Sequence, residues 1–141
     1  MYLLDTNVVS ELRKPRPDER ARAWLESVPN AELLLPAVVL GELQRGVEKL
    51  RRRDRASAVP LQEWLEQLAS SYQVVPMDGG AFREWARLVE GHPERLEVDA
   101  MIAAMAKIHK LTVVSRNVRD FERLGTRVLN PFAPPAQRPS R

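Results

Sequence analysis

Four acidic side chains stand beside apolar stretches of the sequence, where charged residues are unusual. These acids are Asp5, Glu42, Asp99 and Asp120. The chain has no cysteine and only two histidines, so any metal bound here would take oxygen ligands. Oxygen donors suit hard cations such as Mg²⁺ or Mn²⁺. Such an ion neutralises a phosphodiester, generates hydroxide from water and stabilises the leaving oxyanion. The acids therefore predict metal-assisted phosphodiester hydrolysis, with one ion or two left open.

The first two acids also have structural interpretations. Asp5 ends the apolar run before it and could cap a helix over Val8–Leu12, although Thr6 and Asn7 could each do the same. Glu42 lies at the edge of an apolar helical stripe, where it could pair with a nearby arginine. Taken singly, neither acid decides between structure and chemistry.

The other two acids differ in how well a structural role explains them. Asp99 precedes the apolar run 100–106, where an ionised carboxylate is costly unless it is paired or bound to a metal. A place in the first turn of a helix is its structural alternative. Asp120 follows Asn117 by three residues, a spacing that resembles a capping box. Asp120 alone would therefore be interpreted as structural, whereas the four acids together favour a metal site.

Short apolar runs alternating with helical patterns predict the elements that position these acids. We expect strands over residues 2–4, 33–35, 73–76, 111–115 and 127–129, and helices over 8–12, 18–28, 36–53, 60–68, 78–89, 97–110 and 118–124. This alternation predicts an α/β fold with a short, mostly parallel sheet flanked by helices. Ligands of such folds bind beyond the carboxyl ends of the strands, where Asp5 and Arg116 would both lie.

Length and composition limit the organisation of the chain. Its 141 residues fit one domain, which we place at residues 1–132, followed by a Pro-rich and disordered tail at 133–141. The absence of cysteine excludes disulfides and thiolate sites, and no apolar stretch suits a signal peptide or a membrane span. We expect a cytoplasmic protein that does not bind membranes. Arginine dominates the 22 basic residues, which suits phosphate binding but is equally explained by coding bias.

At these residues the sequence resembles the PIN-domain nucleases, and within them the VapC toxins and FitB-type proteins. The resemblance is carried by four segments, Leu3-Leu4-Asp5-Thr6-Asn7, Leu40-Gly41-Glu42-Leu43, Val98–Ala104 and Val113–Phe121. Any one of these motifs is weak, whereas the four in this order are specific and cover nearly the whole chain to about Phe132.

The resemblance implies that Asp5, Glu42 and Asp99 are the core metal-binding acids and that Asp120 is the fourth. The family pattern is looser at the fourth position, so the ligand there could be Asp120, Asn117 or a water held by either.

The resemblance also implies supporting roles for neighbouring polar residues. Thr6 and Asn7 would hydrogen-bond the carboxylates. Ser115, where family members commonly carry Thr, would orient a metal-bound water. Arg116 and Arg13 would contact RNA phosphates, which positions RNA without reading its sequence.

The function implied is that of a Mg²⁺- or Mn²⁺-dependent endoribonuclease toxin that cleaves specific RNA, such as tRNA or ribosomal RNA. A small VapB-like antitoxin would neutralise it, and the toxin would form a homodimer, or a heterotetramer or larger assembly with the antitoxin.

Three other functions compete with the nuclease. A phosphotransferase with Asp5 as nucleophile would want a second acid at the position of Asn7. A receiver-like signalling domain would want a lysine after the last strand, and the sequence has none there. A PIN-like binding module, acting mainly in a transcription-repressor complex with little catalysis, remains the principal alternative.

Overall fold

Five short strands form the centre of the computed structural model, which describes residues 1–138. They are β1 (Tyr2–Leu4), β2 (Leu33–Pro36), β3 (Gln73–Val75), β4 (Thr112–Val114) and β5 (Val128–Leu129). All four pairings in the sheet are parallel, in the order β3-β2-β1-β4-β5. Leu3 and Leu4 of the central strand are fully buried. Burial of both faces explains why β1 is a continuous apolar run, and the predicted parallel α/β fold is confirmed.

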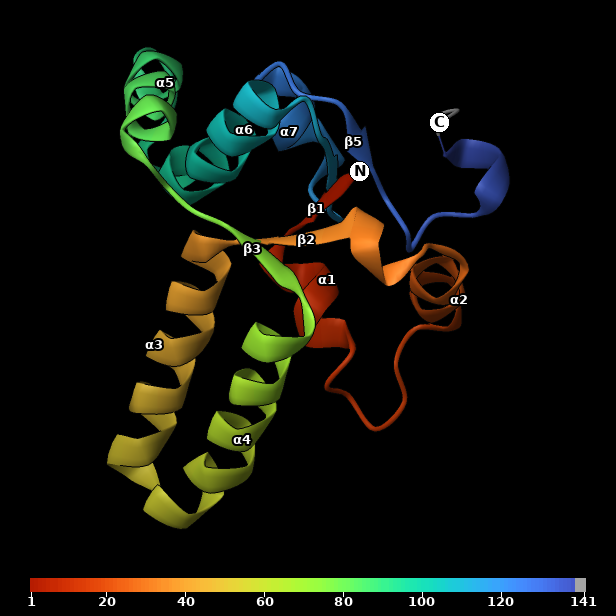
Figure 1. The fold of residues 1–141 in the computed structure, drawn as a ribbon, viewed down its shortest axis with the longest axis vertical. Helices are drawn as coiled ribbons and strands as arrows, with labels where there is room; N and C mark the ends of the chain where they lie inside the picture. Colours follow the sequence, from red (N-terminus) through yellow and green to blue (C-terminus); the bar gives the residue numbers. More distant parts are fainter. Residues whose placement is uncertain (139–141) are drawn as a thin grey trace.

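Seven helices and three short 3₁₀ turns surround the sheet in the described residues (Figure 1). The helices are α1 (Thr6–Glu11), α2 (Glu19–Ser27), α3 (Ala37–Arg53), α4 (Arg55–Ser71), α5 (Gly79–Val89), α6 (Glu97–His109) and α7 (Val118–Arg123). The turns are η1 (Asn30–Glu32), η2 (Glu94–Leu96) and η3 (Pro135–Gln137). In Figure 1, α5, α6 and α7 lie above the sheet, whereas α1 and the α3–α4 hairpin lie below it. No helix within residues 1–138 is long and apolar enough to cross a membrane.

The order of the strands creates a switch point beside the first strand. The chain leaves β1 toward β2 and β3 on one side, and later returns to place β4 and β5 on the other. Leu4 of β1 is in register with Val114 of β4, and the Asp5 N–H donates to the Val114 carbonyl at 3.0 Å. The two segments that follow these strands therefore begin side by side, as ligand sites in open α/β sheets require.

Two predicted helix starts are wrong because aspartate caps begin the helices earlier. α1 begins at Thr6, with Asp5 as its N-cap. α4 begins at Arg55 rather than at Pro60, because the Asp54 side chain accepts a hydrogen bond from the Ser57 N–H. Pro60 consequently lies inside α4, where it removes one backbone donor without ending the helix.

The C-terminal segment folds back along the domain as far as it is described. Arg138 donates through Nη2 to the Pro131 carbonyl at 2.8 Å and through Nε to the Ala133 carbonyl at 3.1 Å. η3 lies between these residues. Residues 139–141, the end of the predicted tail, lie outside the described residues.

Substitution Leu4→Ala tests the central position of β1. The side chain is fully buried, so its loss should lower the free energy of unfolding by about 2–5 kcal/mol, measured by urea denaturation. Val59→Ala, at a side chain that is 52% exposed, is the control and should change stability by less than about 0.5 kcal/mol. Equal effects of the two substitutions would contradict this description of the core.

Candidate active site

The Asp5 carboxylate is buried at the carboxyl end of β1 and is 4% exposed. Its Oδ1 accepts the Thr6 N–H at 2.7 Å, and its Oδ2 accepts the Ser115 hydroxyl at 2.6 Å and Asn7 Nδ2 at 3.2 Å. All three donors are neutral, so they solvate the carboxylate without balancing its charge. Burial raises the pKa of Asp5 above its ordinary value and the charge of Glu42 raises it further, although the bonds from Ser115 and Thr6 oppose this shift.

Ser115 and Asn7 join the segments that follow β4 and β1. Ser115 is fully buried, and its Oγ accepts both the Asn117 N–H at 2.9 Å and Asn7 Nδ2 at 3.2 Å. Asn7 Oδ1 in turn accepts the Arg116 N–H at 3.2 Å. Because each side chain has two or more partners, this network holds the loop after β4 in a defined position relative to Asp5.

Glu42 is an exposed residue on α3, and it reaches the same edge of the sheet. Its Oε1 accepts the Thr6 hydroxyl at 2.6 Å. Thr6 therefore contacts two acids, Asp5 through its N–H and Glu42 through its hydroxyl. Within residues 1–138 Glu42 takes part in no salt bridge, so the alternative of an arginine partner is wrong.

Asp99 lies in the first turn of α6, where the charges of the other three acids reach it. Its pKa is raised to about 6, first by burial and then by repulsion from Asp5, Asp120 and Glu42. The positive charge of Arg95 opposes this shift and lowers the pKa of Asp99. The structure thus brings all four predicted acids into one electrostatic cluster, hereafter the acidic cluster.

Asp120 occupies the first turn of α7 and makes an ion pair that the sequence did not predict. Arg95 Nη1 lies 3.3 Å from both Asp120 oxygens. Asn117 stands at the N-cap position, but its side chain makes no capping hydrogen bond, so the capping-box interpretation of Asp120 is wrong. Arg95 sits in η2, a polar turn whose sequence carries no signal of contact with α7.

The acidic cluster fits a hydrated cation better than a fully enclosed one. Within residues 1–138 no three acidic or histidine side chains are close enough to hold a metal ion by themselves. Its donors are carboxylate oxygens, and the pKa values of Asp5 and Asp99 are both raised by burial and by neighbouring negative charge. Mg²⁺ commonly binds through one or two carboxylates and keeps several waters. The residues present therefore suit a hard, partly hydrated divalent ion.

The two predicted RNA-binding arginines lie in different surroundings. Arg116 follows Ser115 directly, and its guanidinium stacks 3.9 Å from the centre of the Phe132 ring. Its Nη2 lies 4.0 Å from Glu11, a buried acid that sequence reasoning missed because it falls within a short, unremarkable helix. Arg13 is exposed in the turn after α1 and its N–H donates to the Ser10 carbonyl.

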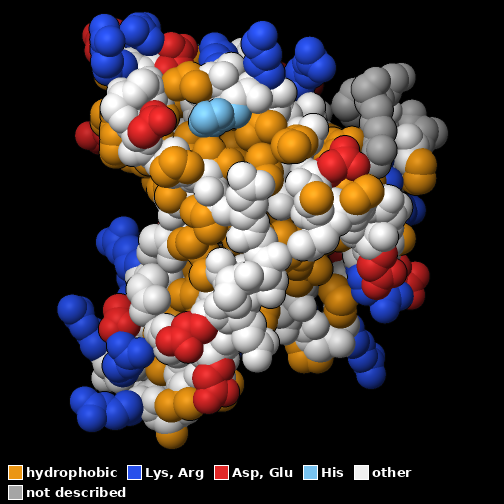
Figure 2. Space-filling view, viewed as in Figure 1, with side chains coloured by type: hydrophobic (Ala, Val, Ile, Leu, Met, Phe, Trp, Pro, Cys, Tyr) orange, Lys and Arg blue, Asp and Glu red, His pale blue; other side chains and the backbone are white. Residues whose placement is uncertain are grey.

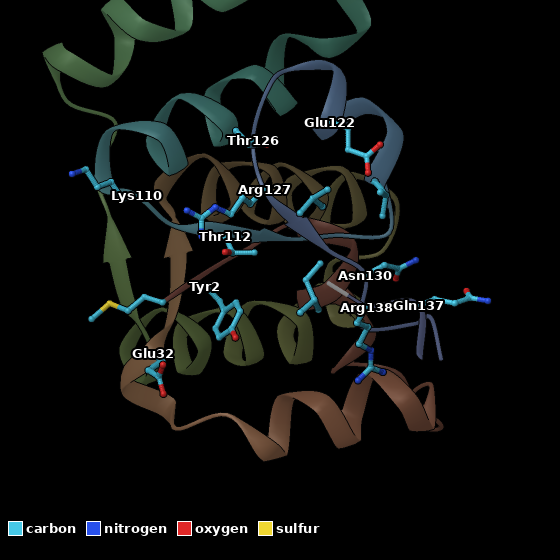
Figure 3. A pocket seen from close by; sticks show the side chains of 14 residues that line it. Tyr2, Glu32, Lys110, Thr112, Glu122, Thr126, Arg127, Asn130, Gln137 and Arg138 are labelled. Atoms are coloured by element: carbon cyan, nitrogen blue, oxygen red, sulfur yellow. The ribbon is translucent and has the colours of Figure 1, made fainter. Parts of the chain in front are cut away.

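A separate cavity of about 740 Å³ is lined by residues of β1, β4 and β5 and of the segment that follows β5. Figure 3 shows Tyr2, Thr112 and Arg127 around it, at or beside the amino ends of β1, β4 and β5. None of the four acids lines this cavity, so it is not part of the acidic cluster.

The raised pKa of Asp99 predicts how the metal-free protein responds to pH. A carboxyl whose folded-state pKa exceeds its unfolded value binds more protons in the folded state, so its charge costs stability as pH rises through that interval. The thermal midpoint in EDTA should therefore rise when pH falls from about 7 to about 5. Asp99→Asn should flatten this dependence and raise the midpoint at neutral pH. A variant less stable than wild type at neutral pH would contradict the repulsion.

Arg95 and Asp5 act on Asp99 in opposite directions, which a titration can measure. Arg95→Gln should raise the pKa of Asp99 because a neighbouring positive charge is lost, and Asp5→Asn should lower it because a negative one is lost. The measurement is the carboxyl-carbon chemical shift of Asp99 against pH by NMR, without metal. Shifts of the same sign in both variants would contradict the acidic cluster.

Comparison with known proteins gives the same family over nearly the whole chain. The PIN domain model matches residues 2–126. Toxin FitB of Neisseria gonorrhoeae is 34% identical over 94% of this chain and 99% of its own length. VapC ribonuclease Y4jK of Sinorhizobium fredii is 33% identical over 95% of this chain and 99% of its own.

Solved structures agree with the sequence matches. The crystal structure of FitAcB from Neisseria gonorrhoeae superposes with a TM-score of 0.83 at 35% identity, over 94% of this chain and 99% of the other. The structure of FitAB bound to an IR36 DNA fragment gives 0.82 at 32% identity, over 94% and 96%. Since family model, full-length relatives and fold all agree, the chain belongs to the PIN domain family.

Proposed function

We propose that this chain is a Mg²⁺- or Mn²⁺-dependent endoribonuclease, the toxin of a VapBC-like toxin–antitoxin pair. The observation that carries the proposal is the acidic cluster, in which a buried Asp5 has only neutral donors and the charges of Asp5, Asp120 and Glu42 all act on Asp99. A structure that needed only stability would have replaced this repulsion by apolar packing. Relatives named as a toxin and as a ribonuclease support the same activity.

Asp5, Glu42 and Asp99 would hold the cation, directly or through water. A divalent ion bound there supplies a Lewis acid for the phosphodiester and makes bound water a better nucleophile. Thr6 orients Glu42, while Ser115 and Asn7 fix Asp5. Because repulsion from its neighbours raises the pKa of Asp99, a cation bound beside it would favour the ionised form of this carboxyl.

Two residues, Asp120 and Asn117, are candidates for the fourth ligand of the cation. Asp120 is tied to Arg95, so it would join the cation through water or after Arg95 moves away. Asn117 is exposed at the start of α7 with its side chain outside any cap. In either case the side chain would contribute an oxygen ligand beside the other three acids.

RNA is the substrate class that we propose, with tRNA or ribosomal RNA as the candidates. Arg116 follows the buried Ser115 and is 53% exposed in its side chain, so it can contact a phosphate beside the acidic cluster. Arg13 is exposed but makes no described contact with these acids, so its role is limited to the outer rim.

A VapB-like antitoxin and a second copy of the chain are the proposed partners. The solved FitAcB and FitAB structures support such assemblies. Figure 2 shows hydrophobic side chains gathered in the hollow between the α5–α6 pair and the α3–α4 hairpin. Phe82 of α5 is 46% exposed and Ile108 of α6 is 41% exposed, so both offer apolar surface to a partner.

A binding module in a DNA-bound repressor complex is the second candidate, supported by the FitAB complex with DNA. The presence of four clustered acids favours catalysis over binding alone, because their mutual repulsion has a use only where a cation binds.

The proposal is tested by incubating purified chain, free of antitoxin, with total RNA and Mg²⁺ or Mn²⁺, and mapping the cut ends. We expect discrete cuts that disappear with EDTA. Asp99→Asn should reduce cleavage by roughly a hundredfold or more, the scale of losing one preorganised charge at a reacting phosphate. Glu26→Gln, at an exposed acid of α2, is the matched control and should cleave as wild type.

Metal binding is checked separately by thermal unfolding. Mg²⁺ should raise the midpoint of wild type and of Glu26→Gln, and raise that of Asp99→Asn less, because a ligand that binds only the folded state stabilises it. Cleavage that survives Asp99→Asn would place the active site elsewhere. Metal binding without cleavage of any RNA would favour the binding module.

A further inference from the structure

Glu11 is a buried carboxylate that the proposed chemistry does not use. It is the last residue of α1 and is only 5% exposed, so an ionised side chain here needs nearby positive charge. Lys14 Nζ lies 2.9 Å from its Oε2 and 3.3 Å from its Oε1. Oε2 nevertheless has no hydrogen bond of good geometry. Glu11 is therefore a buried anion whose neutralisation depends on cations that reach it from the surface.

Arg116 is the second cation at Glu11, and it comes from a distant part of the chain. Its Nη2 lies 4.0 Å from Glu11 Oε1, and its guanidinium lies over the Phe132 ring at 3.9 Å. Its backbone N–H donates to Asn7, which itself bonds to Asp5. Arg116 is thus held by Glu11, by Phe132 and by Asn7. Asn7 also connects it to Asp5 of the acidic cluster.

The charges of this group leave it able to bind an anion. Two cations, Lys14 and Arg116, face one carboxylate, and their side chains remain 59% and 53% exposed. A guanidinium has five N–H donors, and those of Arg116 that do not face Glu11 remain for a ligand. The group lies beside the acidic cluster. The anion that fits it best is therefore one phosphate of a polymer whose next phosphate is bound at the acidic cluster.

Resting on the nuclease function proposed above, we propose that Glu11 is a positioning residue that, with Phe132, holds Arg116 ready to bind the RNA phosphate next to the one at the acidic cluster. An arginine fixed in advance loses less side-chain entropy when it binds a phosphate. Glu11 does not touch RNA in this arrangement and acts through Arg116.

Removal of Glu11 has two opposing consequences, and their balance decides the proposal. Glu11→Gln removes a negative charge, which by itself would strengthen the attraction for RNA. It also releases Arg116, which weakens binding. At about 0.15 M salt the Debye length is about 8 Å, which weakens the long-range part of the first effect. Ordering one long side chain lowers the affinity by roughly three- to tenfold. We therefore expect weaker binding.

A double-mutant cycle tests this coupling. The dissociation constant of a fluorescein-labelled, single-stranded RNA of mixed sequence is measured in EDTA by fluorescence anisotropy, for wild type, Glu11→Gln, Arg116→Ala and the double variant. Glu11→Gln should weaken binding roughly three- to tenfold in wild type and by less than about twofold in the Arg116→Ala background. Tighter binding by Glu11→Gln, or equal losses in both backgrounds, would overturn the proposal.

Two further variants guard against a trivial explanation. Phe132→Leu keeps an apolar side chain but removes the aromatic face, so it should weaken binding in the same way and also lose its effect in Arg116→Ala. Glu84→Gln breaks a surface pair with Arg87 and should leave RNA binding unchanged. An effect of Glu11→Gln without one of Phe132→Leu would assign Glu11 to stability and overturn its positioning role.

The cycle is read without metal, so it is independent of cleavage. Coupling in binding without any cleavage would contradict the nuclease and support the positioning of Arg116. Cleavage by wild type with no coupling between Glu11 and Arg116 would support the nuclease and overturn the positioning of Arg116 by Glu11.

Discussion

The Asp5 carboxylate sits at the end of a strand that is buried on both faces, and most of the site exists to accommodate it there. A buried charge needs hydrogen bonds from every side, and here they come from Thr6 and Asn7 in α1 and from Ser115 after β4. Thr6 and Asn7 follow Asp5 directly in the chain, whereas Ser115 reaches it only because β1 and β4 are adjacent and in register. The parallel sheet and its switch point are therefore preconditions of the site.

The acidic cluster is held together by the fold against its own repulsion. Burial and then repulsion from neighbouring carboxylates raise the pKa of Asp99 to about 6, and Arg95 opposes this shift. Such an arrangement lowers stability unless a cation is bound, which is the usual relation between stability and activity at a catalytic site. Core packing in the central strands supplies the stability that makes this cost tolerable.

Glu11 shows the contrasting solution for a buried acid. Asp5 is surrounded by neutral donors and other acids, so it retains unbalanced charge for a cation. Glu11 lies only six residues further along the chain and is balanced by Lys14 and Arg116. A region of excess negative charge therefore lies beside a region of excess positive charge, and one short helix, α1, connects the two.

The sequence by itself determined the α/β class, the order of the elements and the identity of the acids, because apolar periodicity and residue chemistry are local properties. The sequence did not predict where α1 and α4 start, because more than one nearby residue could begin each helix. Asp5 caps α1, and Asp54 caps α4 ahead of Pro60. Tertiary structure alone decided that Asp120 pairs with Arg95, that Asn117 does not cap α7, and that Phe132 stacks on Arg116. These contacts join segments that only the strand order brings together, and no local pattern encodes which distant side chain will arrive beside a given charge.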